Sequence, residues 1–218
     1  MRFTIRSVRP LLPASSIPLA LFAIACATTH PENPALDAFP PGVTGSTDVT
    51  YYDVRGTTAR ELVAQMQQLG PKTETGARFF GETQSPLRWQ WSTRSSGPSC
   101  TANGVSVYIR SEITLPRWTP PPDAPPALVE QWKQFLAALE THEIGHKDIS
   151  ARAARDVLTA IRRLDTMCSS FGAEAKRATD GIVARLRVEQ ATYDAETRHG
   201  ATQGATFPPR PISGGRPP

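Results

Sequence analysis

The spacing of apolar residues divides the central part of the chain into a strand-rich half and a helical half. Apolar and polar residues alternate in 87–92 and in 105–109, which is typical of half-buried strands. β-branched and aromatic residues predict further strands at 49–54 and 113–115, and residues 57–70 have the caps and apolar spacing of a helix. This half is therefore predicted to form a small antiparallel sheet with one helix.

The helical half contains no proline between Ala127 and Phe207. Apolar residues recur every three or four positions from Leu128 to Leu164, which predicts one long amphipathic helix or two nearly collinear ones. The segment Cys168-Ser-Ser170 interrupts this pattern, and helical spacing then resumes as far as Tyr193. We therefore predict an α+β fold in which a long helix and an antiparallel return helix follow the sheet.

The ends of the chain differ in composition from its centre. Three arginines, a short apolar run and the small residues Ala23-Ile-Ala25 predict a secretory signal peptide over 1–25. Phe22–Cys26 resembles a bacterial lipobox, which predicts a lipid anchor on Cys26; ordinary cleavage after Ala25 is the alternative. The expected location is the periplasm, the outer membrane through this anchor, or the medium. The predicted domains are a flexible tether at 26–47, a folded domain at 48–205 (β-rich at 48–118, helical at 126–200) and a disordered Pro/Gly tail at 206–218.

Composition excludes several classes of protein. The chain has 218 residues, of which 39% are hydrophobic and 20% charged, and its formal net charge is +4. These values fit neither a membrane bundle nor a disordered polyanion. Three of the basic residues lie in the predicted signal peptide, and the remaining arginines are scattered among acidic residues. No nucleic-acid partner is therefore expected.

The long helix carries the H-E-x-x-H motif as His142-Glu-Ile-Gly-His146. Histidines at i and i+4 project from one helix face, so both imidazoles can bind one Zn²⁺. Glu143 follows the first histidine, where its carboxylate can take a proton from a metal-bound water and deliver it to a leaving amine. The motif predicts a zincin-type active-site helix with Glu143 as general base.

A catalytic zinc usually has a third protein ligand. From His146 to Cys168 the helix extends roughly 33 Å, so an antiparallel return helix comes level with His146 near Asp194. A short loop then makes His199 the first candidate for the third ligand. Asp194, Glu196 and Glu174 are the alternatives, and Asp194 or Glu196 can instead orient an imidazole. Tyr193 is a candidate for stabilising the oxyanion or a plain packing residue.

Two cysteines remain once Cys26 is assigned to the lipid anchor. Cys100 and Cys168 are predicted to form a disulfide, because the envelope of a bacterial cell permits such bonds. The bridge would tie the strand-rich half to the turn between the two helices. Two buried free thiols are the alternative.

The sequence resembles a bacterial domain-of-unknown-function family described as predicted secreted zinc-dependent proteases. The resemblance covers about Tyr51 to Gly200 and is carried by four motifs: Tyr52-Asp-Val-Arg-Gly56, Leu115-Pro-Arg-Trp118, His142-Glu-Ile-Gly-His146 and Tyr193-Asp-Ala-Glu-Thr-Arg-His-Gly200. It implies metallopeptidase-like zinc chemistry and supports the C-terminal motif as part of the site. It implies no particular substrate.

The motifs lead to three hypotheses of function. The first is an exported zinc peptidase that hydrolyses polypeptide or cell-envelope peptide substrates. The second is a zinc amidohydrolase that acts on another amide, such as a cell-wall bond. The third is a non-catalytic envelope lipoprotein with a structural zinc, which has no need of Glu143 as a base.

Overall fold

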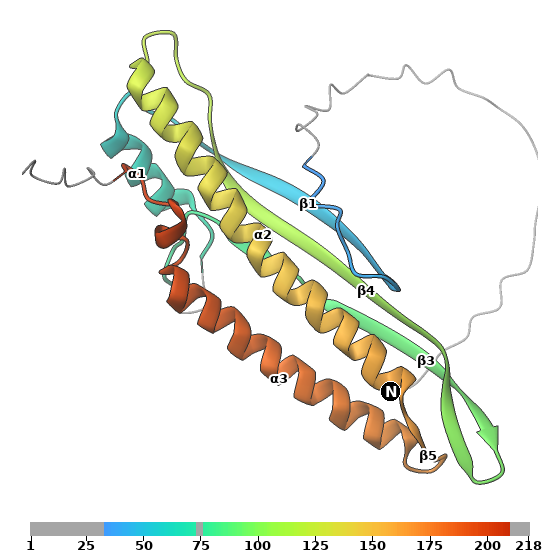
Figure 1. The fold of residues 1–218 in the computed structure, drawn as a ribbon. Helices are drawn as coiled ribbons and strands as arrows, with labels where there is room; N and C mark the ends of the chain where they lie inside the picture. Colours follow the sequence, from blue (N-terminus) through green and yellow to red (C-terminus); the bar gives the residue numbers. More distant parts are fainter. Residues whose placement is uncertain (1–32, 73–75, 210–218) are drawn as a thin grey trace, which may run out of the picture. The chain divides into compact units, whose positions relative to one another are not determined.

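The computed structural model describes residues 33–72 and 76–209, and it is an α+β fold (Figure 1). The predicted signal peptide, Cys26 and residues 210–218 of the predicted tail lie outside the described residues. The elements follow in the order β1 (Val43–Val54), α1 (Ala59–Leu69), β2 (Glu82–Gln84), β3 (Leu87–Ser96), β4 (Ser99–Trp118), α2 (Pro126–Arg162), β5 (Asp165–Met167), α3 (Phe171–Thr197) and the 3-10 helix η1 (Ala201–Gln203). Among these residues, no helix combines the length and apolar content needed to cross a membrane.

β4 is the central strand of the sheet. β2 and β3 pair with it in antiparallel register along one edge, and β1 and β5 pair with it along the other. Three of the four strand pairs are thus antiparallel, as predicted, and the pairing of β1 with β4 is parallel. Helix α1, β2 and β3 separate β1 from β4 along the chain. After this connection the β3–β4 hairpin turns the chain so that β4 runs in the same direction as β1. The strands predicted at 105–109 and 113–115 are parts of this one long strand.

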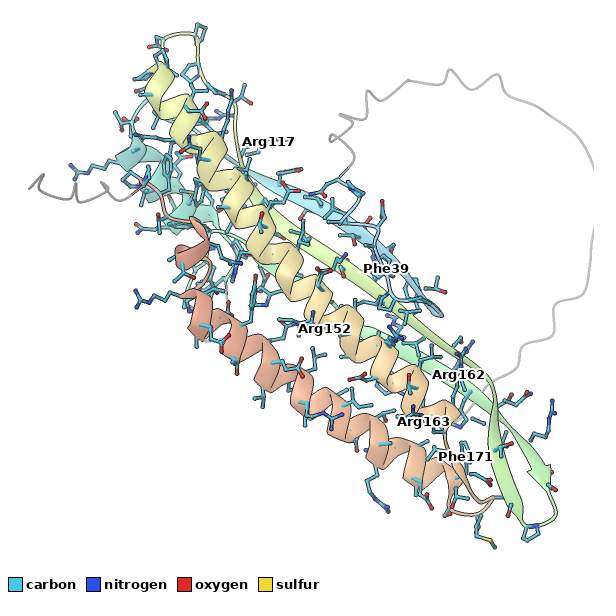
Figure 2. All side chains as sticks on the ribbon, in the orientation of Figure 1. Phe39, Arg117, Arg152, Arg162, Arg163 and Phe171 are labelled. Carbon is cyan, nitrogen blue, oxygen red and sulfur yellow. A yellow bond between two sulfur atoms is a disulfide. The ribbon has the colours of Figure 1, made fainter. Side chains whose placement is uncertain are left out.

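The sheet covers α2 with one face and exposes the other. Val107, Ile109, Ile113 and Leu115 of β4 are buried, whereas Tyr108, Arg110 and Glu112, which alternate with buried positions, are exposed. On the exposed face Arg117 of β4, which is labelled in Figure 2, is paired with Asp53 of β1. Helix α2 is a single helix, and α3 runs back alongside it (Figure 1). The sequence therefore predicted the order of the helices and the turn between them.

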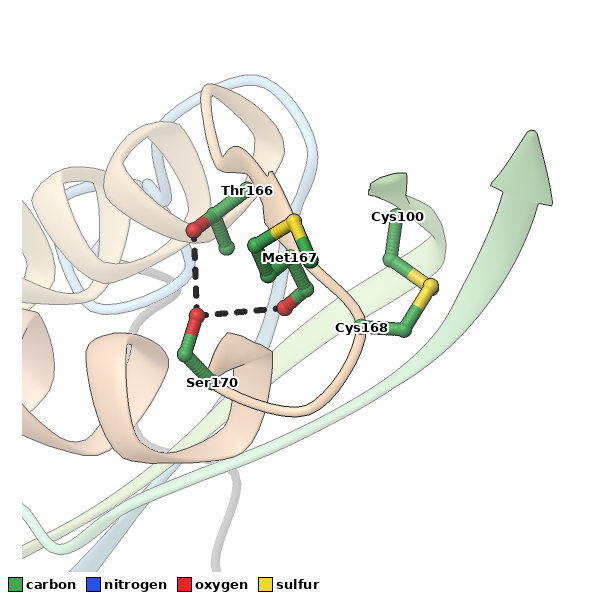
Figure 3. The surroundings of a disulfide bond; sticks show 5 residues. All are labelled: Cys100, Thr166, Met167, Cys168 and Ser170. Atoms are coloured by element: carbon green, nitrogen blue, oxygen red, sulfur yellow. Dashed lines mark hydrogen bonds between the residues drawn. A yellow bond between two sulfur atoms is a disulfide. The ribbon is translucent and has the colours of Figure 1, made fainter. Parts of the chain in front are cut away.

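A disulfide joins the strand-rich part to the helical turn. Cys100 lies on β4 and Cys168 lies between β5 and α3, 68 residues later (Figure 3). The hydroxyl of Ser170 donates to the carbonyl of Met167, and it also lies 3.1 Å from the hydroxyl of Thr166 (Figure 3). The first turn of α3 is thus tied to the segment that contains Cys168.

The folded domain extends beyond both predicted boundaries. β1 begins at Val43, within the predicted tether, and Leu36 packs against the core. The ammonium of Lys147 is completely buried and donates to the carbonyls of Ala35 and Ala38, and burial of a cation requires such acceptors. At the other end Phe207 is buried against Trp132, in the predicted tail. Residues 33–47 and 206–207 therefore belong to the packed structure.

Candidate metal centre

Helix α2 presents the two histidines of the H-E-x-x-H motif side by side. His142 and His146 are one helical turn apart, so their rings meet on the same face of α2. Their Nε2 atoms are 3.2 Å apart, and the His142 side chain is only 4% exposed. Both imidazoles thus direct their Nε2 atoms toward one point beside α2.

Helix α3 brings a carboxylate to the same point. Asp194 Oδ1 lies 3.0 Å from His146 Nε2 and 3.2 Å from His142 Nε2. These three residues form the group whose ligand atoms lie close enough together to hold a metal ion among the described residues. The antiparallel return of α3 therefore places Asp194, one of the alternative ligands, level with the motif.

Two glutamine side chains fix the orientation of the imidazoles. Gln190 donates its amide nitrogen to the His146 carbonyl and to Ser150 Oγ, so its amide oxygen faces His146 Nδ1. Gln203 donates to the Tyr193 hydroxyl, and its amide oxygen lies 3.0 Å from His142 Nδ1. An amide oxygen only accepts hydrogen bonds, so each Nδ1 carries a proton. In a neutral ring, Nε2 therefore carries the lone pair.

Three acceptor atoms that lie this close together repel one another, and a proton or a cation between them relieves the repulsion. Burial opposes a charge on Asp194, but the hydrogen bonds of His142 and His146 outweigh it and hold the pKa of Asp194 well below its usual range. Burial likewise lowers the pKa of His146, yet the hydrogen bonds to Asp194 and Gln190 raise it above the ordinary value. A group of two imidazoles and a carboxylate can therefore hold either a proton or a metal cation, and metal binding would release the proton.

Glu143 lies next to this group and contacts β2, whereas Asp194 approaches the group from α3. The hydroxyl of Thr83 in β2 donates to Glu143 Oε2 over 2.8 Å and lies 3.0 Å from the Glu143 carbonyl. Burial raises the pKa of Glu143, and the hydrogen bond from Thr83 partly offsets this shift. A Cβ atom on Gly81 would lie 2.6 Å from Glu143 Oε1, so the glycine leaves room for the carboxylate. The sheet thus orients this carboxylate directly.

His199, the first candidate for the third ligand, lies outside the group of three. Its Nδ1 is 3.4 Å from Asp194 Oδ1, its side chain is 56% exposed, and its ring contacts Phe79. Helix α3 extends through Thr197, so Asp194 is still on the helix and faces the histidines. His199 follows the end of the helix and has a left-handed backbone with φ of 53°. The structure therefore places Asp194 nearer to the two imidazoles than His199, and the identity of the third ligand stays a prediction.

The other candidate residues have different surroundings. Glu196 is exposed on α3, and Glu174 accepts hydrogen bonds from Thr166 and Ser170 in the first turn of α3, remote from the motif. The ring of Tyr193 stacks on His142 with centroids 5.0 Å apart. Its hydroxyl approaches Gln203 and the His142 carbonyl, and the residue does not line the cleft described below. Tyr193 thus packs against His142, and its role as an oxyanion stabiliser stays a prediction.

The group opens into a cleft of about 760 Å³. Its walls include His142, Glu143, His146 and Asp194, together with residues of β2 and of the preceding loop. Phe79, Phe80, Leu139 and Leu186 make part of the wall apolar. The polar group is therefore accessible to a ligand large enough to be a peptide segment.

Sequence reasoning did not identify Gln190, Gln203, Thr83 or Gly81. Gln190 lies one helical turn before Asp194, and this spacing on α3 was the available indication that it belongs to the site. Thr83 and Gln203 come from separate elements, and only the tertiary structure brings them to the motif. These residues orient the groups that the motif supplies.

One of the comparisons with known proteins gave a match. The model of DUF922, a bacterial protein family of unknown function, matches residues 49–200. This range includes α2 and α3, and hence His142, Glu143, His146 and Asp194. Neither the search of curated proteins nor the search of solved structures gave a match.

Proposed function

This chain belongs to the bacterial family DUF922 of unknown function, and we propose from its site that it is an exported zinc-dependent peptidase. The observation that carries the proposal is the convergence of His142 Nε2, His146 Nε2 and Asp194 Oδ1, whose separations are 3.0–3.2 Å. Ligands of a tetrahedral zinc at 2.0–2.1 Å lie about 3.3 Å apart, which is close to these separations. Two imidazoles and a carboxylate are also a common ligand set of catalytic zinc.

The roles of the protein groups follow from their positions. Zinc, when bound, supplies Lewis-acid activation of water and of a carbonyl group. Burial raises the pKa of Glu143 and so strengthens its carboxylate as the base that takes a proton from the attacking water. The protonated Glu143 then delivers this proton to the leaving amine. Gln190 and Gln203 hold the imidazoles in the tautomer that leaves Nε2 free for the metal.

The sheet offers a place for an extended substrate. β2 pairs with β4 on one edge, and among the described residues its other edge has no partner strand. Gly81, Glu82 and Thr83 line the cleft beside Glu143. A peptide bound as a further strand along β2 would present its carbonyl groups to the site. This arrangement favours a peptidase over a lipoprotein with a structural zinc, which has no use for an accessible cleft and a buried base.

The proposal is tested by metal content and hydrolysis in parallel. The purified protein is expected to bind one zinc and to hydrolyse peptides. Glu143→Gln should retain zinc but lose at least about 100-fold in turnover. Glu130→Gln makes the same charge change on an exposed part of α2 and should leave both unchanged. Zinc-loaded protein that hydrolyses only non-peptide amides would favour the amidohydrolase, and full activity of Glu143→Gln would refute the mechanism.

A further inference from the structure

The cleft is lined by arginines that lie outside the metal group. Three arginines line it: Arg78 from the loop before β2, Arg187 from α3, and Arg198 at the end of α3. Three acidic residues also line the cleft, but Glu143 and Asp194 are engaged in the site itself. The third, Glu82, accepts a hydrogen bond from Gln84.

Two of these arginines have no partner. Within residues 33–72 and 76–209, the guanidinium groups of Arg187 and Arg198 make no hydrogen bond or ion pair, and both residues are exposed. Arg78 donates one hydrogen bond to the Gly70 carbonyl, which leaves its other N–H groups available. Exposed arginines commonly pair with neighbouring carboxylates, so the free donors in this cleft are available to a ligand.

The arginines lie on both sides of the metal group along α3. Arg187 precedes Asp194 by about two helical turns, or roughly 10 Å, and Arg198 follows it by about one turn, or roughly 6 Å. The ring of His199 contacts Phe79 with centroids 5.0 Å apart, so the segment that carries Arg78 lies beside the end of α3 that carries Arg198. Arg187 lies toward the other end. An extended peptide advances about 3.3 Å per residue. If it runs alongside α3, Arg187 lies about three residues from the scissile bond and Arg198 lies about two residues from it on the other side.

We infer that this cleft selects acidic peptides, with aspartate or glutamate side chains on both sides of the bond presented to the metal group. This inference rests on the proposed function and names the substrate class of the same site. Arginine binds carboxylates through paired N–H donors, and the apolar wall at Phe80 and Leu186 receives the intervening residues. A lysine-rich peptide would place like charges against the arginines.

The experiment measures binding apart from hydrolysis. Three peptides of one uncharged framework, bearing glutamate, glutamine or lysine at the same positions and a neutral dye, are titrated into zinc-loaded Glu143→Gln. We expect the glutamate peptide to bind about tenfold more tightly than the glutamine peptide, and the lysine peptide most weakly, since each exposed pair contributes about 2- to 5-fold. Raising the salt concentration should reduce the differences.

Charge-reversed variants identify the arginines responsible. Arg187→Glu and Arg198→Glu should each reduce the preference for glutamate by about 2- to 5-fold or more. Arg177→Glu, on an exposed part of α3 and outside the cleft lining, should preserve it. Equal affinity for the three peptides, or unchanged preference in both cleft variants, would overturn the inference. If wild-type protein cleaves none of these peptides while the binding preference holds, the peptidase proposal fails and the acidic-ligand site stands.

Discussion

Gly145 lies against the hydroxyl end of the Tyr193 side chain. A Cβ atom at position 145 would overlap the Tyr193 hydroxyl and lie 2.5 Å from its Cζ. The glycine inside the H-E-x-x-H motif therefore allows α3 to approach α2 closely enough for Tyr193 to stack on His142. The distance between the two helices, and hence the position of Asp194, depends on this contact.

Gly145→Ala is accordingly expected to lower the free energy of unfolding by about 1–3 kcal/mol, because it overpacks the contact with Tyr193. In the double variant Gly145→Ala/Tyr193→Ala the alanine meets no ring, so its cost should largely disappear. Chemical unfolding of the four proteins of this cycle measures the coupling. Gly181→Ala on α3, where the added Cβ has space, should be neutral or stabilising. Simple additivity of the two substitutions would argue against the contact.

The proposed ligand set predicts that substitutions at Asp194 and at His199 differ in their effect on zinc binding. Asp194→Ala should weaken zinc binding by more than about 100-fold, because it removes the carboxylate beside both Nε2 atoms. His199→Ala should retain zinc, since its imidazole is exposed and lies outside the group. Metal analysis after dialysis against a graded chelator distinguishes them. Loss of zinc from His199→Ala, with the fold retained by circular dichroism, would restore His199 as the third ligand.

The two glutamines are expected to affect metal affinity without touching the metal. Gln190→Ala and Gln203→Ala each remove the acceptor of an Nδ1–H group, which frees the ring to rotate or to change tautomer. Each should reduce zinc affinity by about 10- to 100-fold. Competition with a zinc-binding dye gives the dissociation constants, and Gln134→Ala on exposed α2 provides the control. Affinity equal to that of the wild type would show that other contacts orient the imidazoles.

Lys147 is expected to hold the segment before β1 on the domain. Its ammonium donates to the carbonyls of Ala35 and Ala38 and lies 5.0 Å from the ring centre of Phe39, a residue labelled in Figure 2. Lys147→Met leaves these carbonyls without a donor and should cost about 1–3 kcal/mol. Limited proteolysis should then cut near this segment faster than in the wild type. Lys176→Met, which breaks only an exposed pair with Asp180, should change neither property appreciably.

Local patterns in the sequence were sufficient for much of the fold. Strand alternation, helix caps and the three- and four-residue apolar spacing depend on neighbours along the chain, so they predicted α1, α2, α3 and most of the strands. The same locality places His142 and His146 on one helical face. The parallel pairing of β1 with β4 was not predictable in this way, because it depends on where α1 and the β3–β4 hairpin return the chain.

The sequence by itself determined a helix that presents two imidazoles and Glu143, followed by a return helix that comes level with them at Asp194. Only the tertiary structure decided that Asp194, and not His199, lies between the imidazoles. That choice depends on where α3 ends and on how closely it packs against α2 over Gly145. The glutamine and threonine partners come from three separate elements, and their approach follows from the packing of the whole domain.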